Sequence, residues 1–96
     1  MTHYLFVYDI TDDAVRLRVA NKLKDYGLSR IQYSAFLGEL EPRRYRSLKG
    51  ELKKIISRAR GERKVIHVFP IPLSSLNRVE VIGEWSGEEK EEVEVL

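Results

Sequence analysis

Hydrophobic and polar positions change their spacing several times along the chain, and each change predicts a new element. Runs rich in branched and aromatic residues are typical of β-strands. Such runs lie at residues 3–9, 29–34, 36–40, 64–71 and 79–82. After the first and the third run, apolar residues recur every three or four positions, which predicts amphipathic helices over 13–26 and 42–58.

Residues with strong positional preferences mark the ends of the two helices. Thr11 or Asp12 can cap the first helix, because a side-chain oxygen there accepts from the free N–H groups of the first turn. Gly27 ends this helix, and Pro42 suits the first turn of the second. The inward stripes consist of Val15, Val19, Ala20, Leu23 and Tyr26 in the first helix and of Tyr45, Leu48, Leu52, Ile55 and Ile56 in the second.

The order β-α-β-β-α-β, followed by a short extra strand, predicts a ferredoxin-like α+β sandwich. In this fold both helices cover one face of an antiparallel sheet. In the first strand we expect Leu5 and Val7 to face the helices. Because side chains alternate along a strand, Tyr4, Phe6 and Tyr8 then occupy the open face.

Three aromatic rings on an open sheet face must be covered or used. The sheet of a second copy can pack there, which gives a two-fold homodimer. Alternatively, bases can stack on the rings, as they do on RNA-recognition sheets. The strand at 64–71 lacks the aromatic-rich motif of such RNA binders, so the sequence favours a homodimer formed through the sheet faces.

The composition of the chain excludes several kinds of catalytic and metal site. The 96 residues suffice for one domain with one modest core. The chain has no cysteine, which excludes disulfides, thiolate metal sites and cysteine nucleophiles. Its two histidines, His3 and His67, are too few for a histidine-built zinc site and are interpreted as ordinary strand residues. With neither a long apolar run nor a signal-peptide pattern, we expect a cytoplasmic protein that does not associate with membranes.

Charge divides the chain into a basic domain, residues 1–83, and an acidic C-terminal tail, residues 84–96. The tail holds six Glu and one Lys, whereas the domain holds 16 basic and 9 acidic residues. A basic body suits a polyanion such as nucleic acid. The tail either is solvated or docks on a basic surface, and Trp85 is expected to anchor it by packing.

Asp9 stands at the end of the first strand and is the principal candidate for chemistry. A sheet-to-sheet dimer brings two Asp9 side chains close to its axis. One divalent ion held between them can polarise a phosphodiester and activate a water molecule. The alternative is that Asp9 caps the turn together with Thr11. Asp12 and Asp13 are interpreted as acids that stabilise a helix start rather than as metal ligands.

Several arginines and lysines accompany this acid. Arg16 falls on the apolar arc of the first helix, so its guanidinium must find a partner, and it is aimed toward Asp9. Arg18 points away and either is solvated or contacts phosphate, while Arg30 starts the second strand. The outer side of the second helix is either a solvated face or a phosphate track, built from Arg43, Arg44, Arg46, Lys49, Lys53 and Lys54.

The chain resembles the CRISPR-associated protein 2 family over roughly residues 3–83. The motifs that carry the resemblance keep their order and spacing in this short chain. They are Tyr8-Asp9-Ile10, Asp12-Asp13, Arg16, Arg18, Leu23, Tyr26-Gly27, Arg30-Ile31-Gln32-Tyr33-Ser34, Phe36, Gly38 and Pro42.

The resemblance implies a ferredoxin-like homodimer that cleaves RNA or DNA in CRISPR spacer acquisition and antiviral defence. It implies that Asp9 binds Mg²⁺, or another divalent metal such as Mn²⁺, and is catalytic. It makes Tyr8, Arg16, Arg18, Arg30 and Phe36 candidates for supporting activity or binding substrate. It also implies that the strand at 79–82 joins the partner's sheet.

Two other roles accompany this resemblance. Some members of the family act as a non-catalytic scaffold that holds DNA between dimers of the CRISPR integrase. A related toxin-type ribonuclease family shares the fold and the strand-end aspartate.

Overall fold

The computed structural model describes residues 1–84; the predicted acidic tail, apart from Glu84, and the packing expected of Trp85 lie outside this range. The described elements follow the predicted order through residue 71, and a short helix comes next. They are β1 (Thr2–Ile10), α1 (Asp13–Asp25), β2 (Ser29–Gln32), β3 (Ala35–Leu40), α2 (Pro42–Ile56), β4 (Lys64–Ile71) and α3 (Leu73–Leu76).

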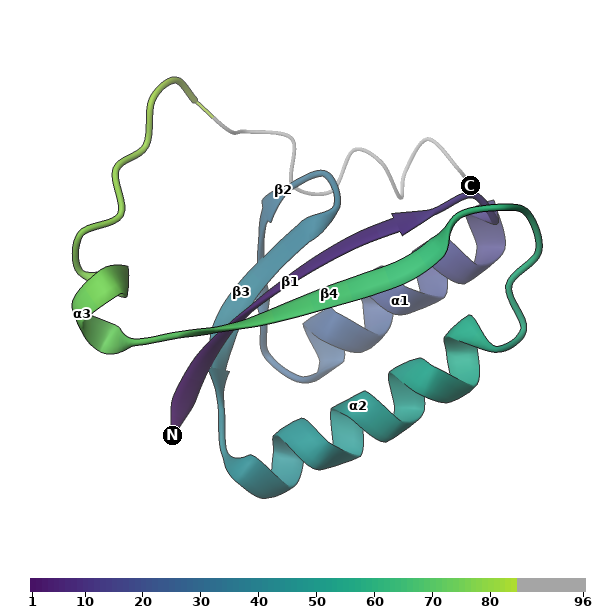
Figure 1. The fold of residues 1–96 in the computed structure, drawn as a ribbon, viewed down its shortest axis with the longest axis horizontal. Coiled ribbons are helices and arrows are strands. Elements are labelled where there is room, and N and C mark those ends of the chain that lie inside the picture. The colour runs from purple at the N-terminus through teal and green to yellow at the C-terminus, as the bar shows by residue number, and fades with distance from the viewer. Residues whose placement is uncertain (85–96) are drawn as a thin grey trace.

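The four strands form one antiparallel sheet in the order β2-β3-β1-β4, so β1 is central and β4 is an edge strand. Leu5 of β1 lies opposite Leu37 on one side and Phe69 on the other, which fixes the faces of all three strands. Helices α1 and α2 lie side by side along the same face of the sheet (Figure 1). The ferredoxin-like prediction is therefore confirmed.

The ends of the helices follow from the residues that mark them. Asp12 caps α1 by accepting a hydrogen bond from the backbone N–H of Val15, and Pro42 stands in the first turn of α2. Gly27, just past α1, has a φ of 89°, a left-handed conformation that suits glycine. The residues buried in the helix layer match the predicted stripes and are Val15, Val19, Ala20, Leu23, Leu48, Leu52 and Ile55.

The two faces of β1 are the reverse of the expectation. Phe6 and Tyr8 are buried against the helices, and the ring of Tyr4 stacks on Tyr45 of α2 with centroids 4.2 Å apart. Leu5 and Val7 are half-buried on the open face. Both alternating sets of residues in β1 are apolar, so the alternation alone does not determine which set is buried.

Asp9 and Ile10 explain the choice. Asp9 belongs to the same alternating set as Leu5 and Val7, so burying those two residues would also have turned a carboxylate toward the helix layer. The set that contains Phe6 ends instead in Ile10, which is buried. Because the three rings lie in or against the core, they offer no platform for stacked bases, and an RNA-binding sheet built on them is ruled out.

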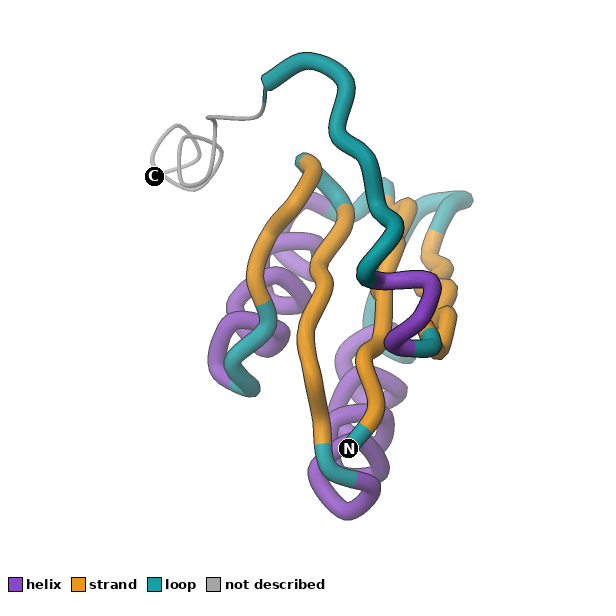
Figure 2. The backbone as a smooth tube through the Cα atoms, turned by 90° about the vertical axis from the view of Figure 1, so that its left-hand side faces the viewer, coloured by secondary structure: helices purple, strands orange, loops and turns teal. Residues whose placement is uncertain are grey.

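The expected strand at 79–82 does not form in the single chain. The residues after β4 instead form the short helix α3 and then a loop that leaves the sheet (Figure 2). Val79, Val81 and Ile82 are largely exposed, and Ile82 is 98% exposed. A strand needs a hydrogen-bonded neighbour, and none is paired with this segment within the described residues.

The two long helices are joined at one end by a polar cluster. The hydroxyl of Tyr26, at the end of α1, donates to Oε2 of Glu51 at 2.6 Å and lies 2.9 Å from Oγ of Ser47. Glu51 also pairs with Lys22 at 2.9 Å. The guanidinium of Arg44 lies over the Tyr26 ring and donates to its backbone carbonyl. These contacts hold α1 against α2.

Candidate functional site at the end of the central strand

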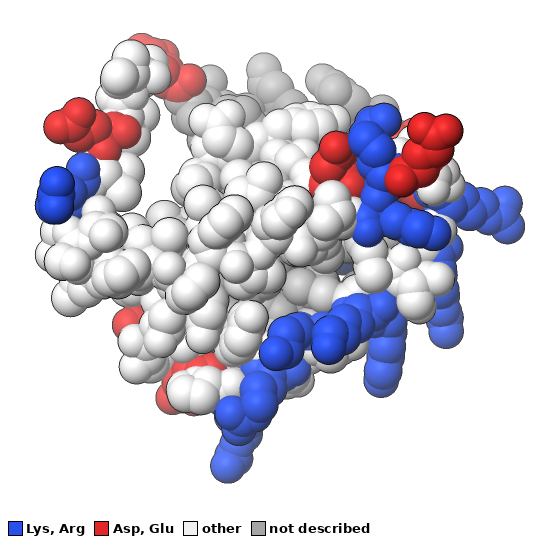
Figure 3. All heavy atoms as spheres, viewed as in Figure 1, with Lys and Arg blue, Asp and Glu red and all other residues white. Residues whose placement is uncertain are grey.

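Asp9 is the second-last residue of β1, and its side chain projects from the open face of the sheet. Its side chain is 60% exposed, and its neighbour across the ladder is Val65 of β4. The same face carries Leu5, Val7 and Phe69. The carboxylate therefore stands at the border of a largely uncharged surface, which occupies the centre of Figure 3.

The partner of Asp9 is Arg63, a residue that sequence reasoning missed. Nε of Arg63 donates to Oδ1 of Asp9 at 2.9 Å, and both side chains are about equally exposed. Arg63 lies 54 positions away, in the loop between α2 and β4. Within residues 1–84 the hydrogen bond of the Asp9 carboxylate is made with Arg63, which does not support the alternative that Asp9 caps the turn with Thr11.

The loop that carries Arg63 is fastened to the turn after β1. The N–H of Thr11 donates to the carbonyl of Arg63 at 2.8 Å, and the N–H of Arg63 donates to Oγ1 of Thr11 at 3.0 Å. Gly61 makes this approach possible: its φ is 91°, and a Cβ there would lie 2.8 Å from Cβ of Thr11. A glycine shortly before the last strand was the one signal in the sequence for this contact.

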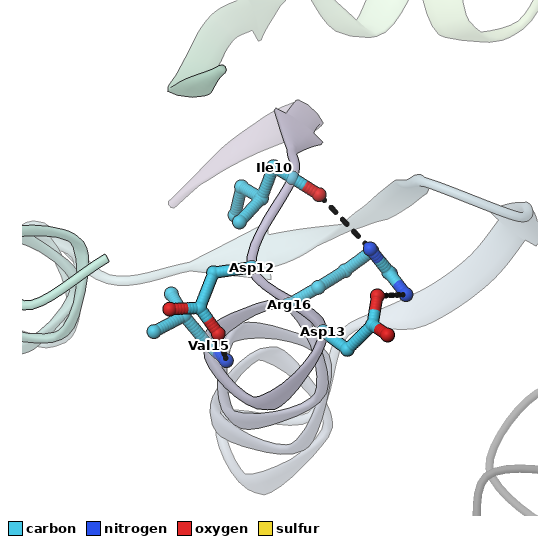
Figure 4. Close-up of polar contacts among 5 residues, drawn as sticks. All are labelled: Ile10, Asp12, Asp13, Val15 and Arg16. Atoms are coloured by element: carbon cyan, nitrogen blue, oxygen red, sulfur yellow. Dashed lines mark hydrogen bonds and ion pairs between the residues drawn. The ribbon is translucent and has the colours of Figure 1, made fainter. Parts of the chain in front are cut away.

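Asp12 and Asp13 are occupied locally, as predicted for acids at a helix start. Oδ1 of Asp12 accepts from the N–H of Val15 at 3.2 Å, and Oδ2 accepts from the N–H of Arg60 at 2.9 Å. These N–H groups, with that of Arg60 first, hold the pKa of Asp12 below its ordinary value of 3.8. Asp13 pairs with Arg16 (Figure 4).

Arg16 reaches the end of β1. Its Nη1 donates to the carbonyl of Ile10 at 2.9 Å, and its Nη2 donates to Oδ1 of Asp13 at 2.6 Å (Figure 4). Arg16 thus satisfies a carbonyl at the strand end and braces the start of α1. The expectation that Arg16 is aimed at the end of the first strand agrees with this contact, in which the main-chain oxygen of Ile10 is the acceptor.

Three of the other candidate residues meet on the helix-facing side of the sheet. Arg30 is only 9% exposed, and its guanidinium carbon lies 5.0 Å from the centroid of the Phe36 ring. Its Nη2 lies 3.5 Å from the hydroxyl of Tyr8, whose ring is also close to Phe36. Tyr8, Arg30 and Phe36 therefore form a buried cluster on the face opposite Asp9. A cation over an aromatic ring is favourable there.

Arg18 lies elsewhere, in an open groove between α1 and α2. The groove measures about 510 Å³, and its charged lining consists of four cations, Arg18, Lys22, Lys54 and Arg58, and two acids, Asp25 and Glu51. It belongs to the helix layer, whereas Asp9 projects from the open face. A row of basic residues also follows one side of the molecule in Figure 3, where α2 runs. The structure thus separates the cationic helix layer from the carboxylate.

One chain offers a divalent metal too few ligands. Within residues 1–84, no group of three Asp, Glu, His or Cys side chains is placed to hold an ion. Asp12 and Asp13 serve the helix start, which leaves Asp9 as the hard oxygen donor that faces outward. The donor type suits Mg²⁺, but the donor number requires a second carboxylate from another copy.

These features define a ferredoxin-like α+β domain with one exposed carboxylate at the end of its central strand and a basic helix layer behind it. Residues 1–79 match the family model described as CRISPR associated protein Cas2. The chain belongs to this family.

Relatives and solved structures agree with this assignment. A protein of Korarchaeum cryptofilum named CRISPR-associated endoribonuclease Cas2 is 48% identical over 67 residues, which cover 70% of this chain and 69% of the relative. A Thermoproteus tenax protein named a Cas1/Cas2 endonuclease fusion is 43% identical over 70 residues, covering 72% of this chain and 25% of the relative. A chain from a partial Cas6-RT-Cas1–Cas2 complex superposes with a TM-score of 0.74 at 28% identity, covering 85% of this chain and 91% of that chain.

Across residues 1–84, none of the helices has the length and apolar character needed to cross a bilayer.

Proposed function

We propose that this protein is a metal-dependent endonuclease that cleaves phosphodiester bonds of RNA or DNA and takes part in CRISPR spacer acquisition and antiviral defence. The observation that carries the proposal is Asp9, an exposed carboxylate at the rim of an uncharged sheet face. Relatives named endoribonucleases support the activity. This role places the cleavage in the cytoplasm.

The active form is a homodimer in which two open sheet faces pack together. This face carries Phe69 and Val65, which are 47% and 41% exposed, and the half-buried Leu5 and Val7. Large exposed apolar side chains clustered on one face are typical of an interface. A two-fold axis near the strand ends brings both Asp9 carboxylates together. The exposed segment at 79–82 adds to the partner's sheet at a free edge.

The two Asp9 carboxylates hold one Mg²⁺, or another divalent metal such as Mn²⁺. A bound divalent ion of this kind polarises a phosphodiester and supplies a nucleophilic water near neutral pH. The chain's own residues do the rest. Arg16 braces the strand end that carries Asp9, and the buried Tyr8, Arg30 and Phe36 support the sheet beneath it. Arg18 and the basic residues of α2 hold the phosphate backbone at the helix layer.

Replacement of Asp9 tests this function. Asp9→Asn keeps the size of the side chain but removes the charged metal ligand, so cleavage of single-stranded RNA and of duplex DNA should fall at least about 100-fold. The measurement compares both substrates with Mg²⁺ and with chelator. Glu41→Gln, at an exposed acid before α2, is the matched control and should retain wild-type activity. Unchanged cleavage by the Asp9 variant would contradict the proposal.

A second function has its own support. A relative is named as a fusion with Cas1, and a structural neighbour comes from a Cas1–Cas2 complex. In this alternative the protein is a scaffold that binds the CRISPR integrase and duplex DNA without cleaving either. Asp9→Asn separates the two functions, since spacer integration by the purified integrase then persists at wild-type rate in the variant.

A further inference from the structure

Arg63 makes a contact with the candidate metal ligand that the proposed function does not use. Its guanidinium donates to Oδ1 of Asp9 at 2.9 Å and so occupies one of the two oxygens of the carboxylate that a metal ion would share. The two side chains are 61% and 60% exposed. Ion pairs exposed to this degree are weak, so a divalent ion can displace the guanidinium from Asp9 readily.

The ion pair is also not needed to hold the loop in place. The main chain of Arg63 already makes two hydrogen bonds with Thr11, one with its N–H and one with its hydroxyl, and the N–H of Arg60 donates to Asp12. Gly61 allows the close approach. The backbone of Arg63 therefore stays beside Asp9 whether or not the side chains are paired. When the guanidinium leaves the carboxylate, it remains within one side-chain length of it.

We propose that Arg63 alternates between two partners: Asp9 when no metal is bound, and the phosphate at the cleavage site when a divalent ion occupies Asp9. A guanidinium is suited to this exchange because its planar fork binds a carboxylate or a phosphate with similar geometry. In the metal-free protein the pair holds the guanidinium on Asp9, away from the substrate. In the complex Arg63 binds the substrate phosphate next to the metal. This inference rests on the proposed function, but its two halves can be measured separately.

Metal affinity tests the first half. Arg63→Gln removes the competing cation, so the Mn²⁺ affinity of Asp9, measured by electron paramagnetic resonance, should rise roughly two- to fivefold. Cleavage by the same variant should fall at least about tenfold. Arg60→Gln removes an equal charge from the same loop, keeps the backbone N–H that Arg60 donates to Asp12, and should change neither quantity. A purely structural ion pair would not move metal affinity and cleavage in opposite directions.

Binding of nucleic acid without metal tests the second half, and it needs neither Mn²⁺ nor cleavage. In chelator, Arg63→Gln should weaken the binding of a fluorescent oligonucleotide by less than about twofold in the wild-type background, where Asp9 holds the guanidinium. In the Asp9→Asn background the guanidinium is free, and the same change should weaken binding roughly five- to tenfold.

The outcomes are distinct. Equal losses in the two backgrounds would show that Arg63 is an ordinary surface charge, and no loss in either would show that it does not reach phosphate; each overturns the exchange. Unchanged Mn²⁺ affinity in Arg63→Gln overturns the competition at Asp9. If Asp9→Asn leaves both Mn²⁺ binding and cleavage intact, the proposed function itself fails, and the oligonucleotide measurement still judges the phosphate contact of Arg63.

Discussion

At the scale of single residues, two neighbouring carboxylates have different tasks because the strand ends between them. Asp9 is the last outward-facing residue of β1 and is left with one exposed partner, Arg63. Asp12 has turned into the helix start, where two backbone N–H groups bind it. The carboxylate with the weaker attachment is the one available for a metal, and the one with the stronger attachment stabilises the fold.

The pKa of Asp12 leads to a prediction for acid stability. Because the N–H groups of Arg60 and Val15 hold this pKa below its ordinary value of 3.8, ionised Asp12 stabilises the folded state. That contribution is present above the ordinary pKa of 3.8 and is lost as the pH falls through the lowered pKa. Asp12→Asn keeps an acceptor oxygen for the helix cap but does not ionise. Its Tm, followed by circular dichroism, should therefore fall less than the wild-type Tm between pH 5 and pH 2. If the Tm of the variant and of the wild type fell equally with pH, this role of Asp12 would be contradicted.

At the scale of elements, the contact between α1 and α2 depends on polar as well as apolar groups. The hydrogen bond from Tyr26 and the ion pair with Lys22 lower the pKa of Glu51, and Glu51 in turn raises the pKa of Lys22. All three residues lie at the end of the helix pair where Gly27 terminates α1. The cluster therefore fixes how the two helices meet, and with it the groove that contains Arg18.

Tyr26→Phe isolates the hydroxyl of this cluster. The variant keeps the ring under Arg44 but loses the donor to Glu51, which should lower the free energy of unfolding by about 1 kcal/mol. In a domain of this size that corresponds to a Tm lower by about 4–8 °C. Urea titration and calorimetry measure both quantities. Tyr33→Phe, at an exposed tyrosine with no recorded hydroxyl contact, is the control, and an equal loss there would remove the role given to Tyr26.

The element scale also shows what the sequence can predict. Helical stripes, caps and the first four strands were predicted correctly, because each is encoded over a few adjacent residues, whereas the fifth strand at 79–82 did not form. The prediction of which side of β1 is buried was wrong, because both alternating sets of its residues are apolar. Which set faces the helices depends on Asp9 at one end of the strand and on the helix layer, which lies outside the strand. The ion pair of Asp9 with Arg63 spans 54 positions and depends on how a loop closes, which no local pattern records.

At the scale of the whole molecule, charge and apolar surface occupy different sides. The open sheet face carries apolar side chains, while cations line the groove of the helix layer. In the proposed dimer the apolar faces meet at the centre, and both helix layers point outward. Nucleic acid then meets cations on two opposite flanks of the particle.

A charge placed on the open face tests this arrangement. Phe69→Glu puts a carboxylate in the middle of the proposed interface, where burial of an unpaired charge is strongly unfavourable. The dissociation constant of the dimer, measured by analytical ultracentrifugation, should rise at least about 100-fold. Asn21→Glu introduces the same charge at an exposed position of α1 and should leave the dimer intact. A dimeric Phe69→Glu protein would place the interface on another face.

The outer edge of β4 has one more consequence, which concerns solubility. This strand runs for eight residues with one side unpaired in the described part of the chain, and its only proline, Pro70, stands next to its end. Long unpaired edges are templates for the strands of other chains. A chain kept apart from its partner therefore exposes backbone groups that recruit further copies edge to edge. The segment that closes this edge in an assembly also protects the protein from aggregation.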